Sequence, residues 1–123
     1  MSSKCGKFNV EVKRVYEDTS AEDGAKFLVD GLWPRGVSKS ALKGVPWVKE
    51  VAPSAALRKW YGHDPEKWKE FQKRYRAELA KNSEAWKPLL EAGKKGDVAL
   101  LTSTHEVEIS HATVLRDFLK RKC

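Results

Sequence analysis

Apolar and polar residues alternate near the start of the chain, and this alternation predicts a strand. Phe8, Val10 and Val12 take turns with polar residues, the pattern of a strand with one buried face. Residues 26–32 are apolar at consecutive positions, as expected of a central strand covered on both faces. Residues 98–101 have the same character and end in a run of hydroxyl side chains. The pattern therefore predicts three strands, of which two are buried.

Between these strands, capping residues and helical spacing predict two helices. A Pro-Ser step at residues 53–54 opens a short helix, which Gly62 can end in the left-handed conformation. Asp64 followed by Pro65 is typical of the start of a longer helix. That longer helix is expected to pack on the sheet through one apolar stripe, formed by Trp68, Phe71, Tyr75 and Leu79.

Two more helices are predicted around the last strand. One covers roughly residues 83–93, where Pro88 removes a backbone hydrogen bond and leaves the boundaries open. The other begins at about Ser110 and has an apolar side with Val114, Leu115, Phe118 and Leu119. Strands separated by helices favour one α/β domain over residues 1–123. We expect a three-layer-like architecture, in which helices flank a short, mostly parallel sheet. Residues 1–6 and 120–123 are expected to be loose.

Composition supports one hydrophobic core, and the charge favours anionic partners. The chain has 123 residues, 41% of them hydrophobic, which fits a single domain. Lys and Arg number 24 against 17 Asp and Glu, for a formal charge of +7 that favours phosphate-bearing partners or other anions. Part of this surplus lies in residues 94–95 and 120–122, where such charges are usually solvated. Charge alone therefore makes a weak case for nucleic-acid binding.

Cysteine usage and hydropathy bear on where the protein works. Cys5 and Cys123 lie at opposite ends of the sequence, which fits neither a disulfide framework nor a zinc site. No stretch approaches the length of a membrane span, and the amino end lacks the pattern of a signal peptide. We therefore expect a cytoplasmic protein with no membrane partner. The oligomeric state does not follow from the sequence.

Three polar segments stand out because a plain globular domain would not need them. Trp-Pro-Arg-Gly at residues 33–36 follows closely after Asp30, and Gly-His-Asp-Pro occupies residues 62–65. The third segment joins the last strand to the last helix and carries Thr102, Ser103, Thr104, His105, Glu106, Glu108 and His111. Open α/β folds keep their sites at the carboxyl ends of parallel strands. We therefore expect one crevice, lined by Asp30, Arg35, His63, Glu106 and His111.

The same motifs resemble those of the YeaO-like family of small uncharacterised proteins, domain of unknown function 488. The family pattern has a Trp-Pro-Arg-Gly turn, an Ala-Pro-Ser helix start and a Gly-His-Asp-Pro step, and its later motif matches Glu106 and His111. The resemblance covers residues 12–119 and implies no established activity. The chain departs from the pattern in three places, with Gly31 where arginine is usual, His105 where an acid is common and Ser110 where asparagine is common. The missing arginine puts in doubt any role that the family gives to it.

A divalent metal is the first chemistry to consider. Possible ligands are His63, His105, Glu106, Glu108 and His111. However, His105 and His111 do not have the four-residue spacing of a His-Glu-x-x-His helix. The spacing of the ligands therefore does not indicate a metal site, although it does not exclude a divalent ion, and we expect no cofactor.

General acid–base chemistry is the second possibility. His111 or His63 would transfer a proton, with Glu106 or Asp30 as the partner. Arg35 would hold an anionic substrate through its planar fork. Structural roles compete with these interpretations, because His63 precedes a helix cap and Asp30 could simply pair with Arg35.

Anion binding without catalysis is the third possibility. The hydroxyl groups of Thr102, Ser103 and Thr104 and the free amides at the start of the last helix could receive a phosphate, assisted by Arg35 or Arg58. Trp33 could line the same pocket or stack on a base. The sequence lacks a glycine-rich phosphate cradle, so this signal is weak.

Together these observations favour a protein that binds a small anionic or phosphorylated ligand, with turnover left open. Arg35 would neutralise the anion, His111 would transfer a proton, Glu106 would orient it and His63 would offer a second imidazole. The alternative is a basic, non-enzymatic module that binds nucleic acid or regulates a partner. It would use Arg35, Arg58, the lysines of the tail and exposed tryptophans.

Overall fold

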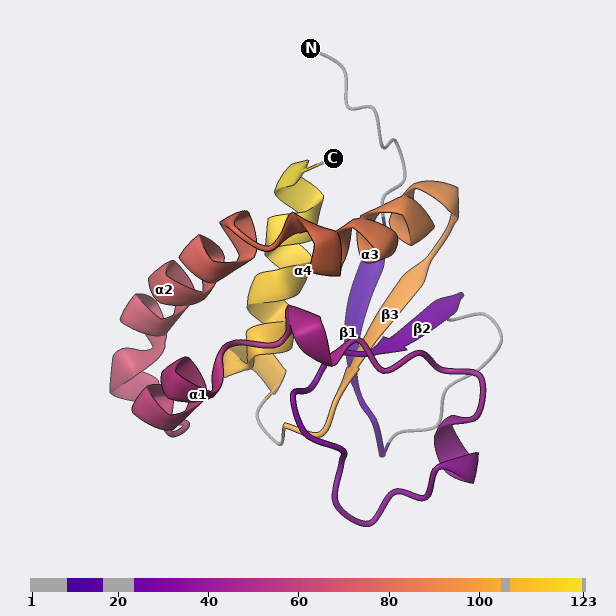
Figure 1. Cartoon of the computed structure of the whole chain (residues 1–123), viewed down its shortest axis with the longest axis horizontal. Coiled ribbons are helices and arrows are strands. Elements are labelled where there is room, and N and C mark those ends of the chain that lie inside the picture. Colours follow the sequence, from indigo (N-terminus) through magenta and orange to yellow (C-terminus); the bar gives the residue numbers. More distant parts are fainter. Residues whose placement is uncertain (1–8, 17–23, 105–106, 123) are drawn as a thin grey trace.

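Three parallel strands form the sheet of the computed structural model, which describes residues 9–16, 24–104 and 107–122 (Figure 1). The strands are β1 (Val10–Arg14), β2 (Ala25–Leu28) and β3 (Val98–Thr102), in the order β1-β3-β2. The predicted parallel pairing of the last two strands is confirmed, with Leu28 opposite Leu101. The start of the first predicted strand and the loose segment expected at residues 1–6 lie outside the described residues.

The central strand is β3, so the prediction of a central strand at residues 26–32 was wrong. All five residues of β3 are buried, whereas β2 is shorter than predicted and lies at the edge of the sheet. The end of β2 is nevertheless covered on its outer side, because Leu28 forms a bridge with Trp47. The amide of Leu28 donates to the carbonyl of Pro46 at 2.9 Å. This added neighbour explains why an edge strand has the apolar pattern of a central one.

Four helices complete the α/β domain, and the predicted class is confirmed. They are α1 (Ala55–Tyr61), α2 (Trp68–Ala80), α3 (Ser83–Lys95) and α4 (His111–Lys122). Val98 and Leu100 of β3 belong to the large core formed with these helices. Ala99 and Leu101 belong to a smaller core, with Trp33, Val37 and Val45 packed against it. An irregular segment, rather than a layer of long helices, therefore contributes to this second core.

Side-chain caps determine where α1 and the 3-10 turn before α2 begin, at the two positions that the sequence predicts. The hydroxyl of Ser54 accepts a hydrogen bond from the amide of Leu57 at 3.2 Å, and Gly62 ends α1 in the left-handed conformation with φ 54°. The carboxylate of Asp64 accepts from the amide of Glu66 at 3.0 Å, in the short 3-10 turn that leads into α2. These contacts orient the corner from α1 to α2 beside the site.

The packing of α2 differs from the prediction. Phe71, Tyr75 and Leu79 are buried as expected, but α2 packs mainly against α1 and α4, and α4 in turn contacts β1 and β3 (Figure 1). A three-stranded sheet is narrow, and α4 occupies the surface that the apolar stripe of α2 was expected to cover. The stripe therefore meets another helix, for which it is equally suited.

Two smaller expectations also have clear outcomes. Pro88 lies inside α3, which continues through it without a break. Residues 120–122 were expected to be loose, but they form the last turn of α4, whose buried Phe118 and Leu119 anchor it to the core.

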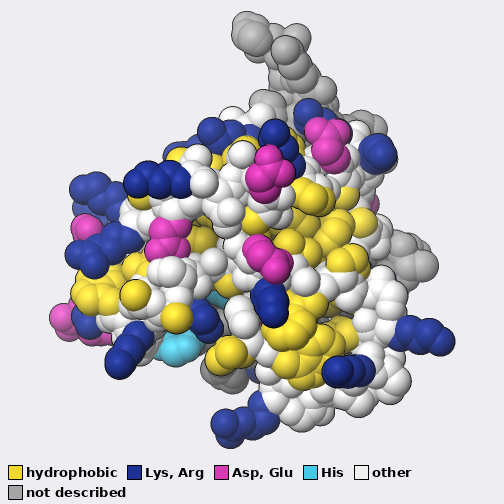
Figure 2. Space-filling model, in the orientation of Figure 1, with side chains coloured by type: hydrophobic (Ala, Val, Ile, Leu, Met, Phe, Trp, Pro, Cys, Tyr) yellow, Lys and Arg dark blue, Asp and Glu magenta, His cyan; other side chains and the backbone are white. Residues whose placement is uncertain are grey.

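None of the helices in the described part of the chain is long and apolar enough to span a membrane. On the face shown in Figure 2, lysine and arginine side chains are scattered rather than gathered in one stripe.

Candidate functional site

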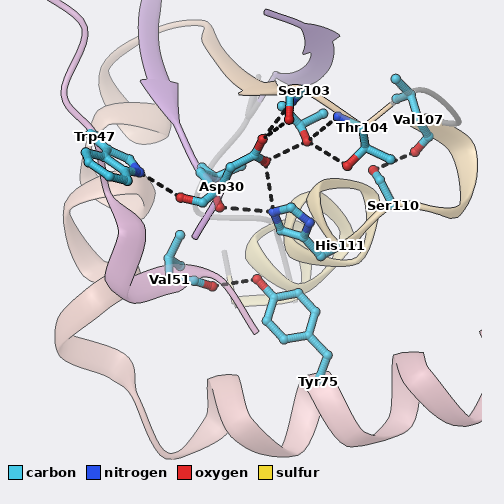
Figure 3. A network of polar contacts seen from close by, with 11 residues as sticks. Asp30, Trp47, Val51, Tyr75, Ser103, Thr104, Val107, Ser110 and His111 are labelled. Atoms are coloured by element: carbon cyan, nitrogen blue, oxygen red, sulfur yellow. Dashed lines mark hydrogen bonds and ion pairs between the residues drawn. The ribbon is translucent and has the colours of Figure 1, made fainter. Parts of the chain in front are cut away.

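The carboxylate of Asp30 is the centre of a polar network at the carboxyl ends of β2 and β3 (Figure 3). Strand pairing continues for one residue beyond β2, because the amide of Val29 donates to the carbonyl of Leu101 at 3.0 Å. This brings Asp30 level with the end of β3. The hydroxyl of Thr102 donates to Oδ1 at 2.6 Å, and the amide and hydroxyl of Ser103 donate to Oδ2 at 2.7 and 2.8 Å. A buried carboxylate is thus held by short, charge-assisted hydrogen bonds.

This network changes the roles expected of the strand-end hydroxyl groups. Thr102 and Ser103 were expected to bind the ligand, but their donors already serve the carboxylate of Asp30. Thr102 is fully buried and does not line the cavity described below. The alternative pairing of Asp30 with Arg35 is also absent among the described residues, and Oδ1 of Asp30 instead lies 3.4 Å from Nε2 of His111. Asp30 therefore organises the end of the sheet from within.

His111 is the first residue of α4, and its ring is fixed by two oxygen atoms. Nε2 lies 3.0 Å from the carbonyl oxygen of Val29 and 3.4 Å from Oδ1 of Asp30. Both neighbours are acceptors, so Nε2 must carry a proton, and Nδ1 of the neutral ring is the acceptor. Burial lowers the pKa of His111 below its ordinary value. The charge of Asp30 and the hydrogen bond to Val29 raise this pKa, but by less than burial lowers it, and the charges of Arg58 and His63 lower it further. The neutral imidazole is therefore the form favoured in the folded protein.

We expect the lowered pKa of His111 to make folding stability depend on pH. The unfolded chain takes up a proton near pH 6.5 and the folded chain only at lower pH, so the unfolded state binds more protons in between. The free energy of unfolding should therefore fall as the pH drops from 6.5 to the folded pKa, by at most about 1.4 kcal/mol per pH unit. Urea unfolding between about pH 7 and 5 measures this slope.

The histidine variants separate this effect from other titrations. His111→Gln should flatten the slope relative to the parent protein, whereas His63→Gln should change it much less, because the charge of His63 is the smallest of the effects on the pKa of His111. Parallel pH profiles for the parent protein and His111→Gln would contradict the assignment.

Tyr75 supports the imidazole from the helical side. Its ring meets that of His111 edge-on, with centroids 6.2 Å apart, and its hydroxyl donates to the carbonyl of Val51 at 2.6 Å. Burial, with smaller effects from Glu78 and Asp30, raises the pKa of Tyr75 well above its ordinary value. The phenol therefore stays protonated and acts as a structural donor.

A cavity of about 350 Å³ lies beside this network. Most of the residues expected at the site line it, namely Asp30, Trp33, Arg35, Arg58, His63, Ser103 and His111. Thr102 is not among the lining residues, and Glu106 lies outside the described residues. A cavity of this size is at the small end of the range for ligand-binding sites, about 300 to 1,000 Å³. It has room for a small molecule.

The guanidinium group of Arg58 lies against the backbone of Gly31 at the cavity wall. A Cβ atom at Gly31 would stand only 2.9 Å from Cζ of Arg58. Nε of Arg58 is buried and has no hydrogen-bond partner among the described residues. Where the family pattern has arginine at position 31, this chain has a glycine that leaves room for Arg58. A cation nevertheless lies beside position 31, because α1 supplies Arg58.

Arg35 and His63 reach the same cavity from its exposed side. Arg35 lies in the Trp-Pro-Arg-Gly turn and its side chain is exposed, while its carbonyl accepts a hydrogen bond from Tyr16 at 2.9 Å. His63 follows Gly62 and has a positive φ of 57°, a conformation in which histidine is more common than most residues. The two turns singled out in the sequence thus meet at one opening.

An aromatic wall of the cavity was missed by the sequence analysis. Tyr61 and Phe71 stack with ring centroids 4.2 Å apart and planes inclined by 18°. Phe71 also stacks on Tyr75, which links this wall to His111. A signal for Tyr61 was present, because it lies three residues after Arg58 on the same face of α1. Thr104, which was expected to offer a hydroxyl group, also lines the cavity. Further lining residues that were not expected at the site are Gly31, Leu32, Pro53, Ile109 and Ser110.

The described residues form no group of three His, Cys, Asp or Glu side chains able to hold a metal ion. Instead, their arrangement provides a guanidinium fork, a neutral imidazole and a rigid aromatic surface around one cavity. Such a set can hold an oxyanion and an apolar group together.

The parallel sheet, with its cavity at the carboxyl ends of the strands, places the chain among small open-sheet α/β proteins. A family model described as the inactive DUF488-N3 subclade matches residues 9–123, so the chain belongs to this family. This confirms the resemblance seen in the motifs.

Two relatives illustrate the extent of the similarity. The chain is 39% identical over 112 residues to the uncharacterized protein YeaO of Escherichia coli K12, covering 91% of this chain and 97% of that protein. It is 44% identical over 110 residues to the uncharacterized protein Rv3073c of Mycobacterium tuberculosis H37Rv, covering 89% and 92%. The search of solved structures found no match.

Proposed function

We propose that this protein binds a small oxyanion in the cavity, with Arg58 as the anchoring cation, and does not turn the ligand over. The observation that carries the proposal is the state of Arg58. Its guanidinium lines the cavity, its Nε is buried without an acceptor, and it has no acidic partner among the described residues. An unsatisfied buried donor is costly, at about 1 to 3 kcal/mol. An anionic ligand would supply the missing negative charge.

The charge balance of the cavity supports the same proposal. Arg35 joins Arg58 at the wall, and Asp30 is the only carboxylate among the described lining residues. The negative charge of Asp30 is already matched by hydrogen bonds from Thr102 and Ser103. The cavity therefore presents excess positive charge to a ligand, which strengthens anion binding.

Binding without turnover is supported by two features. Asp30 accepts three hydrogen bonds and lies against His111, so it is a positioning residue rather than a free general base. The family is described as an inactive subclade. We therefore keep the anion binding expected from the sequence and leave out the proton transfer assigned to His111, Glu106 and His63. We also infer a cytoplasmic location, from cysteines that fit no disulfide framework.

The alternative, a nucleic-acid-binding module, has less support. It would use exposed tryptophan faces, but Trp60 is half-buried, with the guanidinium of Arg74 4.2 Å from its ring centroid. Trp33 is half-buried and meets Trp47 edge-on at 5.4 Å. The rings that were expected to stack on bases already have partners within the chain.

We expect inorganic phosphate to raise the melting temperature of the parent protein in a saturable way, and Arg58→Ala to abolish this effect. A ligand that binds only the folded state stabilises it, by about 1.4 kcal/mol at ten times its Kd. Differential scanning calorimetry measures the shift, with potassium chloride at matched ionic strength as the salt control. Arg121→Ala removes an exposed arginine near the end of α4 and is the matched variant. An equal phosphate response in parent and Arg58→Ala would contradict the proposal.

A further inference from the structure

The contact between Gly31 and Arg58 shows how the guanidinium is oriented. A Cβ atom at Gly31 would lie 2.9 Å from Cζ, 3.0 Å from Nη1 and 3.2 Å from Nη2 of Arg58. Similar distances to three atoms of one plane mean that the position faces the flat side of the guanidinium. Its edge, where the N–H groups point, remains free of Gly31. The backbone at Gly31 thus packs against the flat side of the guanidinium.

Space, rather than backbone conformation, distinguishes this position, because with any side chain here the guanidinium of Arg58 would have to move. Gly31 is not among the glycines with positive φ, which are Gly24, Gly36, Gly44 and Gly62. Any residue could adopt its backbone angles, but a side chain would collide with the guanidinium. Gly31 therefore determines where Arg58 lies, although it has no functional group of its own.

The walls around this cation are largely apolar. Tyr61 and Phe71 stack on each other at 4.2 Å, and Pro53, Trp33 and Ile109 add further apolar surface. Tyr61 is held in place because its hydroxyl donates to the carbonyl of Ile109 at 3.0 Å. A rigid aromatic surface close to a guanidinium suits a ligand that combines an oxyanion with a flat apolar body.

We propose that the cavity binds small acids with a flat apolar body and a carboxylate or phosphate head, and that Gly31 is a positioning residue for this recognition. This inference rests on the proposed function. The head pairs with the edge of the Arg58 guanidinium, and the body lies against the Tyr61 and Phe71 wall. A planar fork matches two oxygen atoms of either head group, which a lysine cannot do.

Isothermal titration calorimetry with four probes tests the ligand class. Benzoate should bind at least ten-fold more tightly than acetate, and phenyl phosphate at least ten-fold more tightly than inorganic phosphate. Binding of only benzoate or only phenyl phosphate would support the inference and identify the head group. Equal affinities within both pairs would overturn it.

Gly31→Ala tests whether the position of the guanidinium depends on Gly31. It should lower the affinity for benzoate or phenyl phosphate, whichever binds the parent protein more tightly, at least ten-fold. Gly96→Ala is the matched control, because Gly96 has an extended backbone and open space around its Cβ position. Arg58→Lys keeps the charge without the planar fork and should lose binding to a similar extent. It also provides a second test if Gly31→Ala does not fold. Unchanged affinity in a folded Gly31→Ala protein or in Arg58→Lys would overturn the inference.

The two proposals fail in different ways. If inorganic phosphate binds through Arg58 but the aromatic body and Gly31 contribute nothing, the further inference is wrong and the proposed function stands. If none of the four probes binds the parent protein, both are wrong.

Discussion

Asp30→Ala is expected to lower the free energy of unfolding by about 3 to 5 kcal/mol, because three hydrogen bonds to a charged group are lost. Asp30 is only 6% exposed, and its removal leaves the amide of Ser103 without its acceptor and the buried hydroxyl of Thr102 with only Oγ1 of Thr104 to receive its hydrogen bond. It also removes the carboxylate oxygen that lies 3.4 Å from Nε2 of His111. Such a loss corresponds to a decrease in Tm of roughly 10 to 20 °C for a domain of this size. Urea unfolding followed by tryptophan fluorescence measures it.

A matched aspartate provides the control for this experiment. The side chain of Asp117 on α4 is 47% exposed and pairs with the neighbouring Arg116. Asp117→Ala should change the free energy of unfolding by less than about 0.5 kcal/mol. If Asp30→Ala costs no more than Asp117→Ala, the carboxylate network does not hold the strand ends together.

Phe71→Ala is expected to cost about 3 to 5 kcal/mol of stability. Phe71 is fully buried between Tyr61 and Tyr75, and it is part of both the helical core and the cavity wall. Removing the ring leaves a void that a closely packed interior fills only in part. Equilibrium urea unfolding measures the loss.

The conservative variant separates lost volume from lost aromatic stacking. Phe71→Leu keeps most of the apolar volume and should cost less than about 1.5 kcal/mol. It should still lower the affinity for benzoate and phenyl phosphate, since the flat aromatic wall beside Tyr61 is lost. A Phe71→Ala protein as stable as the parent would show that this side chain is not part of the core.

Local signals in the sequence were enough to predict the caps and the position of the site. Ser54 and Asp64 cap their helical segments because each carries an oxygen acceptor just before free amides. Asp30 and His111 meet because a residue after one parallel strand and a residue that opens the helix after its neighbour reach the same edge of the sheet. Both inferences depend on contacts close to a strand or helix end.

Features that depend on distant segments could not be predicted. The irregular segment around Trp47 covers the edge of β2, and α4 takes the place expected for α2, because tertiary packing decides which apolar surfaces meet. The sequence showed only that Gly31 stands where the family has arginine. In the structure, Gly31 leaves room for the guanidinium of Arg58, which comes from α1. No local pattern records a contact between residues so far apart in the chain.

The most direct test of the central claim is an NMR titration that observes the Nε–Hε group of Arg58 while phenyl phosphate is added to the parent protein. This group is buried, so its proton should be visible before the ligand arrives. We expect a saturable shift of the Arg58 signal, whereas the signal of Arg116, whose Nε–Hε donates to Asp117, should stay unchanged. A saturating ligand that leaves the Arg58 signal in place, or no response at any phenyl phosphate concentration, would contradict it.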